Sequence, residues 1–266
     1  MRILARLFTV LLTLATLLAI GVAATVVIDR ARTDGRVEAI ANVALDGPDG
    51  PVLAYRADPA GEGPFPAVVM IHEFWGLRED IARKADALAE EGYVVLAPDT
   101  FRGVSVAWVP AAIWNVVSTP AERVDADLRA VVDALAADPA VDPQRIVVMG
   151  FCYGGGAALR YSLGDPRLAG TGVFYGTLIT DADRLASLPG PLLGIFGAED
   201  AQIPVAEVEA FEAALAAAGV PHDVRIYDGV GHAFVGGIEQ IRAGGPPGDA
   251  WATFLAWTRQ TTAAVE

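Results

Sequence analysis

The chain has 266 residues, a length that fits one domain of ordinary enzyme size together with an N-terminal leader. Only 20% of its residues are charged, and the formal net charge is −14 at pH 7. Nucleic-acid binding requires basic patches that displace phosphate counterions, so this acidic balance argues against a nucleic-acid partner.

The N-terminus combines a basic start with a long apolar run. Arg2 and Arg6 precede residues 7–28, which carry no charge and are numerous enough to cross a bilayer as a helix. The same run fits a signal peptide with small residues at 21–24, although the apolar residues beyond them favour an uncleaved signal-anchor. A basic N-terminus stays in the cytoplasm. Both interpretations therefore predict an extracytoplasmic protein (periplasmic or cell-surface), membrane-anchored by residues 7–28 or secreted after cleavage.

Three segments are expected: a leader over residues 1–28, a polar tether over 29–49, and an α/β domain over 50–266. The tether is expected to pass into an opening β-region around residues 37–55. Within that domain apolar strand-like runs alternate with amphipathic helical patterns, which predicts a mostly parallel sheet with helices on both faces. The expected strands cover residues 67–72, 93–97, 145–149, 170–175, 192–196 and 224–227. The expected helices cover residues 80–91, 122–137, 205–218 and 249–260, and a further helix begins near residue 155.

Residues 103–119 depart from this alternation. They carry Trp108, Ile113 and Trp114 among small apolar residues, between a strand and the next helix. Connections of this kind lie over the carboxyl edge of a parallel sheet, where ligands bind. We expect the wall or lid of an apolar pocket here, with core packing and contact with a membrane as the alternatives.

The only cysteine stands in a glycine-rich turn between a strand and a helix. Gly150 and Gly154 flank Cys152 at two residues on either side, which lets the backbone turn sharply and expose the central side chain. This is the pattern of a nucleophile elbow with sulfur in place of a serine oxygen. A lone cysteine is otherwise a small buried hydrophobe, so the nucleophile interpretation depends on partners elsewhere in the chain.

Two partners follow in the order that such a nucleophile requires. Asp200 lies in a loop after an apolar strand, and His232 lies in a glycine-rich loop after the next strand. His232 would accept the proton of the Cys152 thiol, and Asp200 would orient the imidazole and favour its charged form. A thiolate beside an imidazolium has a depressed pKa, so we expect a reactive sulfur.

The other two histidines are weaker candidates. His222 is expected to be a surface or packing residue. His72 and Glu73 resemble the start of a zinc-binding H-E-x-x-H helix, but Gly76 stands where the second histidine is needed and the preceding residues are strand-like. No metal or organic cofactor is therefore expected.

Together, the Cys152 elbow, Gly197-Ala198-Glu199-Asp200 and Gly229-Val230-Gly231-His232-Ala233-Phe234 resemble the dienelactone hydrolase family of the α/β-hydrolase superfamily. So does Ile71-His72-Glu73-Phe74-Trp75-Gly76-Leu77. The resemblance extends from about residue 52 to the C-terminus. It implies an α/β-hydrolase fold and a hydrolase with Cys152 as nucleophile, His232 as base and Asp200 as the orienting acid.

The resemblance also implies supporting residues. Glu73 matches the family glutamate that contacts the resting thiol and keeps it protonated, and the backbone N–H groups of Phe74 and Tyr153 would form the oxyanion hole. Arg102 matches one of two arginines that hold a substrate carboxylate, but Gly236 stands at the position of the second. An uncharged or apolar ester or lactone is therefore expected.

Trp75 and Trp108 are additional candidates for substrate contact. We expect a cysteine-nucleophile ester or lactone hydrolase that acts on a small-molecule substrate through a thioester, with the membrane as a partner if the leader is uncleaved. The alternative is a non-hydrolytic redox-responsive or ligand-binding domain on the same fold, because a lone thiol in an oxidising compartment is exposed to oxidation. A peptidase is a third possibility, but the chain shows no separate specificity domain.

Overall fold

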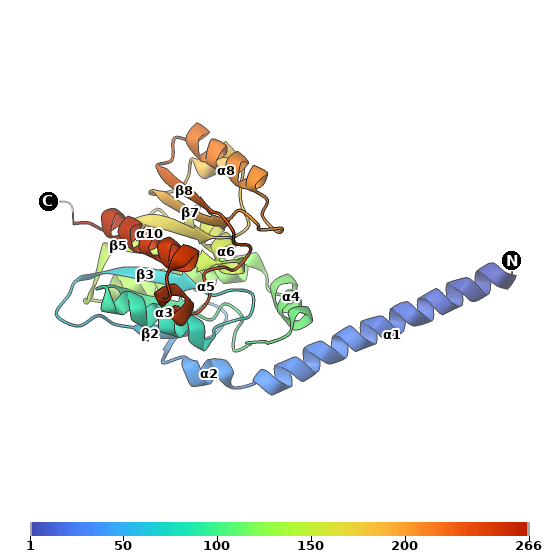
Figure 1. Cartoon of the computed structure of the whole chain (residues 1–266). Coiled ribbons are helices and arrows are strands. Elements are labelled where there is room, and N and C mark those ends of the chain that lie inside the picture. Colours follow the sequence, from blue (N-terminus) through green and yellow to red (C-terminus); the bar gives the residue numbers. More distant parts are fainter. Residues whose placement is uncertain (1, 265–266) are drawn as a thin grey trace.

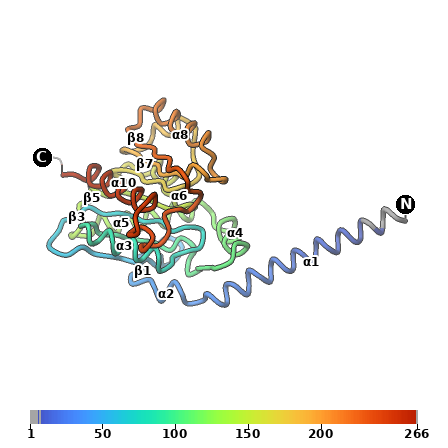
Figure 2. Tube along the Cα trace, in the orientation of Figure 1, coloured from blue at the N-terminus to red at the C-terminus, as the bar shows by residue number. Residues whose placement is uncertain are grey.

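A computed structural model describes residues 2–264. It consists of an α/β body and one long helix, α1 (Arg2–Thr33), which projects from the body so that the two chain ends lie on opposite sides of the molecule (Figures 1 and 2). The segment Phe8–Ile40 is long and apolar enough to cross a membrane, with a hydropathy of 2.5 and 6% of its most apolar window buried. A signal sequence meets the same criterion, so the helix alone does not distinguish the two expectations for the leader.

One eight-stranded sheet forms the centre of the body, with the strand order β1-β2-β4-β3-β5-β6-β7-β8. Strand β2 pairs antiparallel with both β1 and β4, and all other neighbours are parallel. The strands are β1 (Val43–Leu45), β2 (Val52–Ala57), β3 (Phe65–Ile71), β4 (Val94–Pro98), β5 (Val141–Phe151), β6 (Gly170–Phe174), β7 (Leu192–Gly197) and β8 (His222–Tyr227).

Helices cover both faces of the sheet (Figure 1). Alternate residues of β3 belong to different core clusters, Val68 and Met70 to one and Val69 and Ile71 to the other, because successive strand side chains point to opposite faces. Helices α3 and α10 contribute to the first cluster, and α5 and α6 to the second. Besides α1, the helices are α2 (Arg36–Ile40), α3 (Glu79–Glu90), α4 (Val109–Ser118), α5 (Ala121–Ala137), α6 (Tyr153–Ser162), α7 (Ala182–Leu185), α8 (Val205–Ala217), α9 (Ile238–Arg242) and α10 (Gly245–Thr261).

The predicted fold class is confirmed: a mostly parallel sheet, helices on both faces and an apolar N-terminal helix. The expected tether is different. Residues 29–49 contain the last turn of α1, helix α2 and strand β1. Val37 of α2 is fully buried, and β1 pairs with β2, so this segment belongs to the body. Strands β1 and β2 lie within the β-region expected around residues 37–55, whereas helix α2 was not expected.

The end of α1 is fixed to α4, the short apolar helix within residues 103–119. The Asp29 carboxylate accepts the backbone N–H groups of Ala107 and Trp108, at 2.9 and 2.8 Å. Trp108 is the N-cap residue of α4, and Ala107 precedes it. Arg30 also donates to the Asn115 side chain, at 2.7 Å. Asp29 and Arg30 therefore join the projecting helix to the backbone that enters α4 and to α4 itself.

The turn after β5 shows why its glycines are needed. Cys152 has a φ of 53° and a ψ of −115°, and its backbone N–H donates to the Phe174 carbonyl at 2.9 Å. A Cβ on Gly150 would lie 2.2 Å from the Gly154 oxygen, and a Cβ on Gly154 would lie 2.4 Å from the Ile71 oxygen. A side chain at either position would force strand and helix apart.

Replacing Gly154 by alanine is expected to lower the free energy of unfolding by about 2–3 kcal/mol, because its Cβ would meet backbone atoms that cannot move independently. Gly164→Ala is the matched control, since a Cβ there would be 3.7 Å from its nearest neighbour, an ordinary contact. Urea denaturation followed by circular dichroism measures both variants. Equal stabilities for the two variants would contradict the steric argument.

Candidate active site

Loops at the carboxyl edge of the sheet bring Cys152, Asp200 and His232 together. Cys152 follows β5, Asp200 follows β7 and His232 follows β8. The Cys152 Sγ lies 3.1 Å from His232 Nε2, and His232 Nδ1 lies 2.7 Å from Asp200 Oδ2. The three side chains thus form a continuous hydrogen-bonded chain, in the arrangement of nucleophile, base and orienting acid.

Asp200 is held rigidly. Its side chain is fully buried, and its other oxygen, Oδ1, accepts the backbone N–H groups of Gln202 and Ile203 at 2.8 and 3.1 Å. His232 is 17% exposed, so its ring lies between the buried carboxylate and the accessible side of the site. With Oδ1 occupied by the backbone, Oδ2 is left to orient the imidazole.

The sulfur differs from the sequence expectation. Burial and, next, the charge of Glu73 raise the pKa of the Cys152 thiol to about 11, against an ordinary value of 9.0. The resting side chain is therefore a protonated thiol at neutral pH, and the expectation of a depressed pKa was wrong for this state. Ionisation requires the proton to pass to the neighbouring imidazole.

Two backbone donors point at the sulfur. Hydrogen bonds from the N–H groups of Tyr153 and Phe74 act to lower the pKa of Cys152, against the larger effects of burial and Glu73. Tyr153 is the first residue of α6, and Phe74 follows β3. These are the two groups that the family resemblance assigns to an oxyanion hole. In this structure both lie against the resting sulfur.

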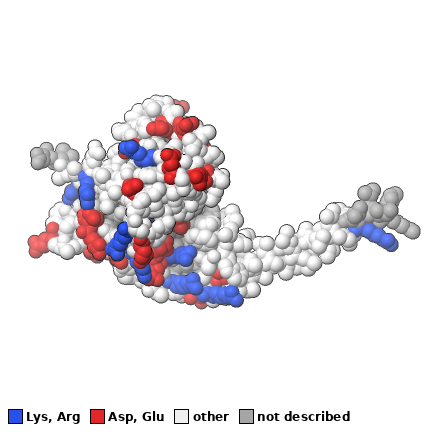
Figure 3. Space-filling model, in the orientation of Figure 1, with Lys and Arg blue, Asp and Glu red and all other residues white. Residues whose placement is uncertain are grey.

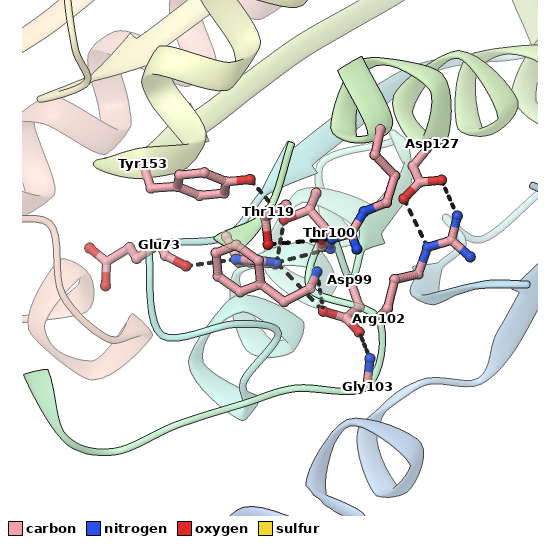
Figure 4. Close-up of polar contacts among 11 residues, drawn as sticks. Glu73, Asp99, Thr100, Arg102, Gly103, Thr119, Asp127 and Tyr153 are labelled. Atoms are coloured by element: carbon pink, nitrogen blue, oxygen red, sulfur yellow. Dashed lines mark hydrogen bonds and ion pairs between the residues drawn. The ribbon is translucent and has the colours of Figure 1, made fainter. Parts of the chain in front are cut away.

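A buried histidine supports the loop that carries Phe74. His72 is fully buried, its Nδ1 lies 2.6 Å from the Glu73 carbonyl oxygen, and its Nε2 accepts the Thr100 backbone N–H at 3.1 Å (Figure 4). Since Nε2 is the acceptor, the proton is on Nδ1 and points to Glu73. Burial lowers the pKa of His72 to about 4. The sequence interpretation considered His72 only as a zinc ligand, whereas its position at the end of a buried strand indicates a structural role.

Asp99 organises the adjacent turn. Its carboxylate accepts backbone N–H groups from Phe101, at 3.0 Å, and from Gly103 (Figure 4). Burial raises the pKa of Asp99 to about 6, although these two hydrogen bonds act in the opposite direction. The network fixes the segment after β4 beneath the loop after β3.

Glu73 lies in an enclosed environment, close enough to Cys152 for its charge to raise the pKa of the thiol. Its carboxylate points away from the His72 network (Figure 4). Burial raises the pKa of Glu73, while the charges of Lys84 and His232 lower it. Lys84 is itself buried, and its Nζ lies 4.4 Å from the centre of the Phe151 ring. A carboxylate and an ammonium group therefore share the interior behind Cys152.

A cavity of about 600 Å³ opens at Cys152 and His232. Its lining contains Cys152 and His232 together with Phe74 and Tyr153, the two backbone donors. Within residues 2–264, no group of three or more His, Cys, Asp or Glu side chains has an arrangement that could hold a metal ion. The rest of the wall is mostly apolar and comes from Val116, Thr119, Ala121, Val124, Gly156, Ala157, Arg160, Tyr175, Thr177, Ile179, Arg184, Gln202 and Ile203.

Three expected substrate-binding residues do not line this cavity. Arg102 is bonded to the Asp127 carboxylate, with its Nε 2.9 Å from Oδ2, and to the carbonyls of Gly50 and Pro51. The guanidinium of Arg102 is thus engaged by Asp127 of α5 (Figure 4), and Arg102 is not among the residues that line the cavity at Cys152.

The two tryptophans also lie elsewhere. The Trp75 ring packs on Phe74, with the ring centres 4.3 Å apart, and Arg32 lies over the Trp108 ring at 5.3 Å. The arginines in the cavity wall are Arg160, which is paired with Asp125 at 2.8 Å, and Arg184. Sequence spacing gave no signal for Arg184, which comes from the short helix α7.

A mostly parallel sheet with a nucleophile elbow, followed by an acid and a histidine at its carboxyl edge, defines an α/β-hydrolase fold. The model of the dienelactone hydrolase family matches residues 52–263. The chain therefore belongs to the dienelactone hydrolase family, a family of hydrolases.

Named relatives agree with this assignment. A protein of Methylorubrum extorquens named "Putative carboxymethylenebutenolidase" is 32% identical, with 80% of this chain and 78% of the relative covered. An Escherichia coli protein of the same name is 31% identical, over 78% of this chain and 82% of the relative.

Solved structures share the fold. A Klebsiella pneumoniae protein described as a "Putative Dienelactone Hydrolase" is 29% identical and superposes with a TM-score of 0.73, over 82% of this chain and 97% of that one. A dienelactone hydrolase-like promiscuous phosphotriesterase from metagenomic libraries is 22% identical with a TM-score of 0.72, over 82% of this chain and 97% of that one. The second likeness concerns the fold alone.

The low pKa of His72 predicts a pH-dependent stability. The ordinary pKa of 6.5 applies to the unfolded chain and about 4 to the folded protein, so between these values only the unfolded state binds this proton. Stability from His72 is therefore lost as the pH falls from 6.5 towards 4, by about 1.4 kcal/mol per pH unit. Asp99 acts oppositely between pH 6 and 3.8, because the folded state binds its proton first.

Comparison with a variant isolates the His72 contribution from that of Asp99. His72→Gln is expected to be less stable than the wild type at pH 7, and the difference should shrink by about 2–3 kcal/mol by pH 4.5. Denaturant unfolding at a series of pH values measures both. His222→Gln, which replaces a half-buried histidine, should keep the wild-type slope. A constant difference between His72→Gln and wild type would show that His72 is not held neutral by the fold.

Proposed function

We propose that this protein hydrolyses carboxylic esters or lactones with Cys152 as the nucleophile. The observation that carries the proposal is the chain of contacts from Cys152 Sγ to His232 Nε2 and from His232 Nδ1 to Asp200, at 3.1 and 2.7 Å. Binding or structural support alone requires no such sequence of thiol, imidazole and buried carboxylate. A family of hydrolases and a cavity open at the sulfur agree with it.

In the first step the substrate carbonyl displaces the sulfur from its two backbone donors. His232 Nε2 takes the thiol proton, and the thiolate attacks the carbonyl carbon. The carbonyl oxygen gains negative charge and accepts the N–H groups of Phe74 and Tyr153. As the C–O bond breaks, the imidazolium returns the proton to the leaving alkoxide, so an alcohol departs and a thioester remains on Cys152.

In the second step water hydrolyses the thioester. His232 removes a proton from the water as the oxygen attacks the acyl carbon, and the same two donors hold the second oxyanion. The C–S bond then breaks, the acid leaves and the sulfur regains its proton from the imidazolium. Asp200 keeps Nδ1 of the imidazole oriented throughout, because its second oxygen is fixed by the backbone.

Glu73 keeps the resting enzyme unreactive in this proposal. Its negative charge is the second cause, after burial, of the raised pKa of Cys152. A protonated thiol is a poor nucleophile and resists oxidation better than a thiolate. This property suits an extracytoplasmic enzyme with a single cysteine, and we assign the protein to that compartment, held by residues 7–28 or released by cleavage.

The cavity suits a mainly apolar, uncharged substrate. Val116, Val124, Ile179 and Ile203 contribute to its wall, and the arginine that would grip a carboxylate, Arg102, is engaged elsewhere. We therefore propose an apolar ester or lactone in preference to a dienelactone that carries a carboxylate.

Cys152→Ala should reduce kcat/KM for a short-chain p-nitrophenyl ester by at least about a thousandfold, because the nucleophile of a triad is lost. Release of p-nitrophenol by the full-length protein in detergent measures this. His232→Gln should have a comparable effect, and His222→Gln is its matched control with wild-type activity. Full activity in Cys152→Ala would refute the proposal, and an inactive wild type across a panel of esters and lactones would favour the redox or ligand-binding alternative.

Glu73→Gln should make Cys152 more reactive in the absence of substrate. Removal of the nearby carboxylate lowers the thiol pKa, and one pKa unit would raise the rate of iodoacetamide labelling at pH 8 by about tenfold. Mass spectrometry of the alkylated chain gives the rate over a range of pH. Glu62→Gln, an exposed carboxylate on a turn, is the control. Unchanged labelling in Glu73→Gln would remove Glu73 from the control of the thiol.

A further inference from the structure

Helix α4 has an apolar surface whose side chains are at least half exposed. Val109, Ile113, Trp114 and Val117 are 50%, 52%, 51% and 70% exposed, and we call this surface the α4 apolar face. The helix has no charged residue anywhere in its sequence, VPAAIWNVVS. Exposed apolar patches of this kind mark sites of contact with a protein or a membrane.

Helix α4 packs on the body through the side opposite to the α4 apolar face. Val109, Ile113 and Val117 recur every four residues and lie along one side of the helix. Ala111, Ala112 and Asn115 are buried on the other side. The exposed face is thus additional to the residues that fold the helix onto the body.

The neighbour of α4 is the apolar helix α1. Val26 of α1 packs in the same small cluster as Ala111 and Ala112, and Asp29 binds the backbone that enters α4. Helix α1 leaves the body from the side where α4 lies, and its surface carries no charge between the basic atoms near its far end and those at the junction (Figures 1 and 3). The α4 apolar face therefore continues an apolar surface long enough to cross a bilayer.

Charged and aromatic side chains gather where α1 meets the body. Arg30 and Arg32 stand at the end of α1, where Figure 3 shows basic atoms at the junction, and Arg32 lies over the ring of Trp108. Tryptophan and arginine at the end of an apolar helix are typical of the boundary between hydrocarbon and lipid headgroups. This combination favours a phospholipid surface over a protein as the occupant of the face.

The same helix forms part of the wall of the catalytic cavity. Val116, at the edge of the α4 apolar face, lines that cavity, as does Thr119 directly after the helix. Ile179 and Ile203 add further apolar surface to the lining of this cavity. Because α4 has no charged residue, a molecule that leaves a lipid surface at α4 could enter the cavity without passing a charged side chain of this helix.

We propose that the α4 apolar face lies in the headgroup region of the bilayer that α1 enters, and that the catalytic cavity takes apolar esters from this bilayer. The first half rests on the α1–α4 surface alone. The second half rests on the function proposed above and narrows its substrate to the class of esters that partition into membranes.

Tryptophan quenching tests the surface without reference to activity. Full-length protein is reconstituted into phosphatidylcholine vesicles with or without lipids brominated in their acyl chains. Wild-type fluorescence should fall with the brominated lipid, and Trp114→Phe should lose most of this quenching. Trp251→Phe, which replaces a tryptophan that is 6% exposed, should retain it. Equal quenching in all three proteins, or a Trp114 shielded by a second copy of the chain, would overturn the membrane contact.

A substrate comparison tests the delivery of esters. The double variant Ile113→Glu/Val117→Glu places charge on the α4 apolar face at two positions that do not line the cavity. We expect hydrolysis of a long-chain p-nitrophenyl ester held in vesicles to fall by about tenfold, because the charged face no longer enters the lipid. Hydrolysis of a soluble short-chain ester should be unchanged, and Ile226→Glu on β8 is the control.

The outcomes separate the two proposals. A double variant that hydrolyses both esters like the wild type would overturn delivery from the bilayer while leaving the hydrolase function intact. A wild type that hydrolyses neither ester would overturn the hydrolase function and with it the substrate class, whereas the quenching result would still decide the membrane contact.

Discussion

The turn at Cys152 holds a residue with a side chain at a φ of 53°, a conformation that costs about 1–3 kcal/mol and persists only where the surroundings enforce it. Here the two strands that flank β5, which are β3 and β6, hold the turn in this conformation. The Cys152 N–H is bonded to the Phe174 carbonyl of β6, and Gly154 lies against the Ile71 carbonyl of β3. The packing that holds the Cys152 backbone in this conformation also brings α6 against the end of β3, which leads to Phe74. One packing arrangement therefore positions the sulfur and both N–H donors.

The ionisable groups around this turn are buried and influence one another. Cys152 and Glu73 both have raised pKa values, principally because they are buried, and the charge of Lys84 is the largest effect that lowers the pKa of Glu73. His72 and Asp99 have pKa values near 4 and 6, also principally because of burial. A proton that moves between groups in this region changes the pKa values of the others, because charges in a protein interior are poorly screened.

The fold and the order of the three central residues could be predicted because they are written locally: Gly150 and Gly154 around Cys152, and apolar runs before Asp200 and His232. Contacts between segments that are distant in the sequence could not be predicted. Arg102 has the right place in the chain for substrate, but Asp127 of α5 binds it. The sequence indicated β structure around residues 37–55, but it gave no sign of helix α2, whose place in the body depends on burial of Val37.

The hydrogen bonds from Ala107 and Trp108 to Asp29 give the projecting helix a defined rotation about its axis. Each residue of an α-helix turns the chain by about 100°. One residue inserted between Ile28 and Asp29 would leave these hydrogen bonds intact and rotate the apolar part of α1 relative to the body. The side of α1 that faces α4 is therefore specified by a count of residues, and the direction in which the cavity opens relative to that helix is specified with it.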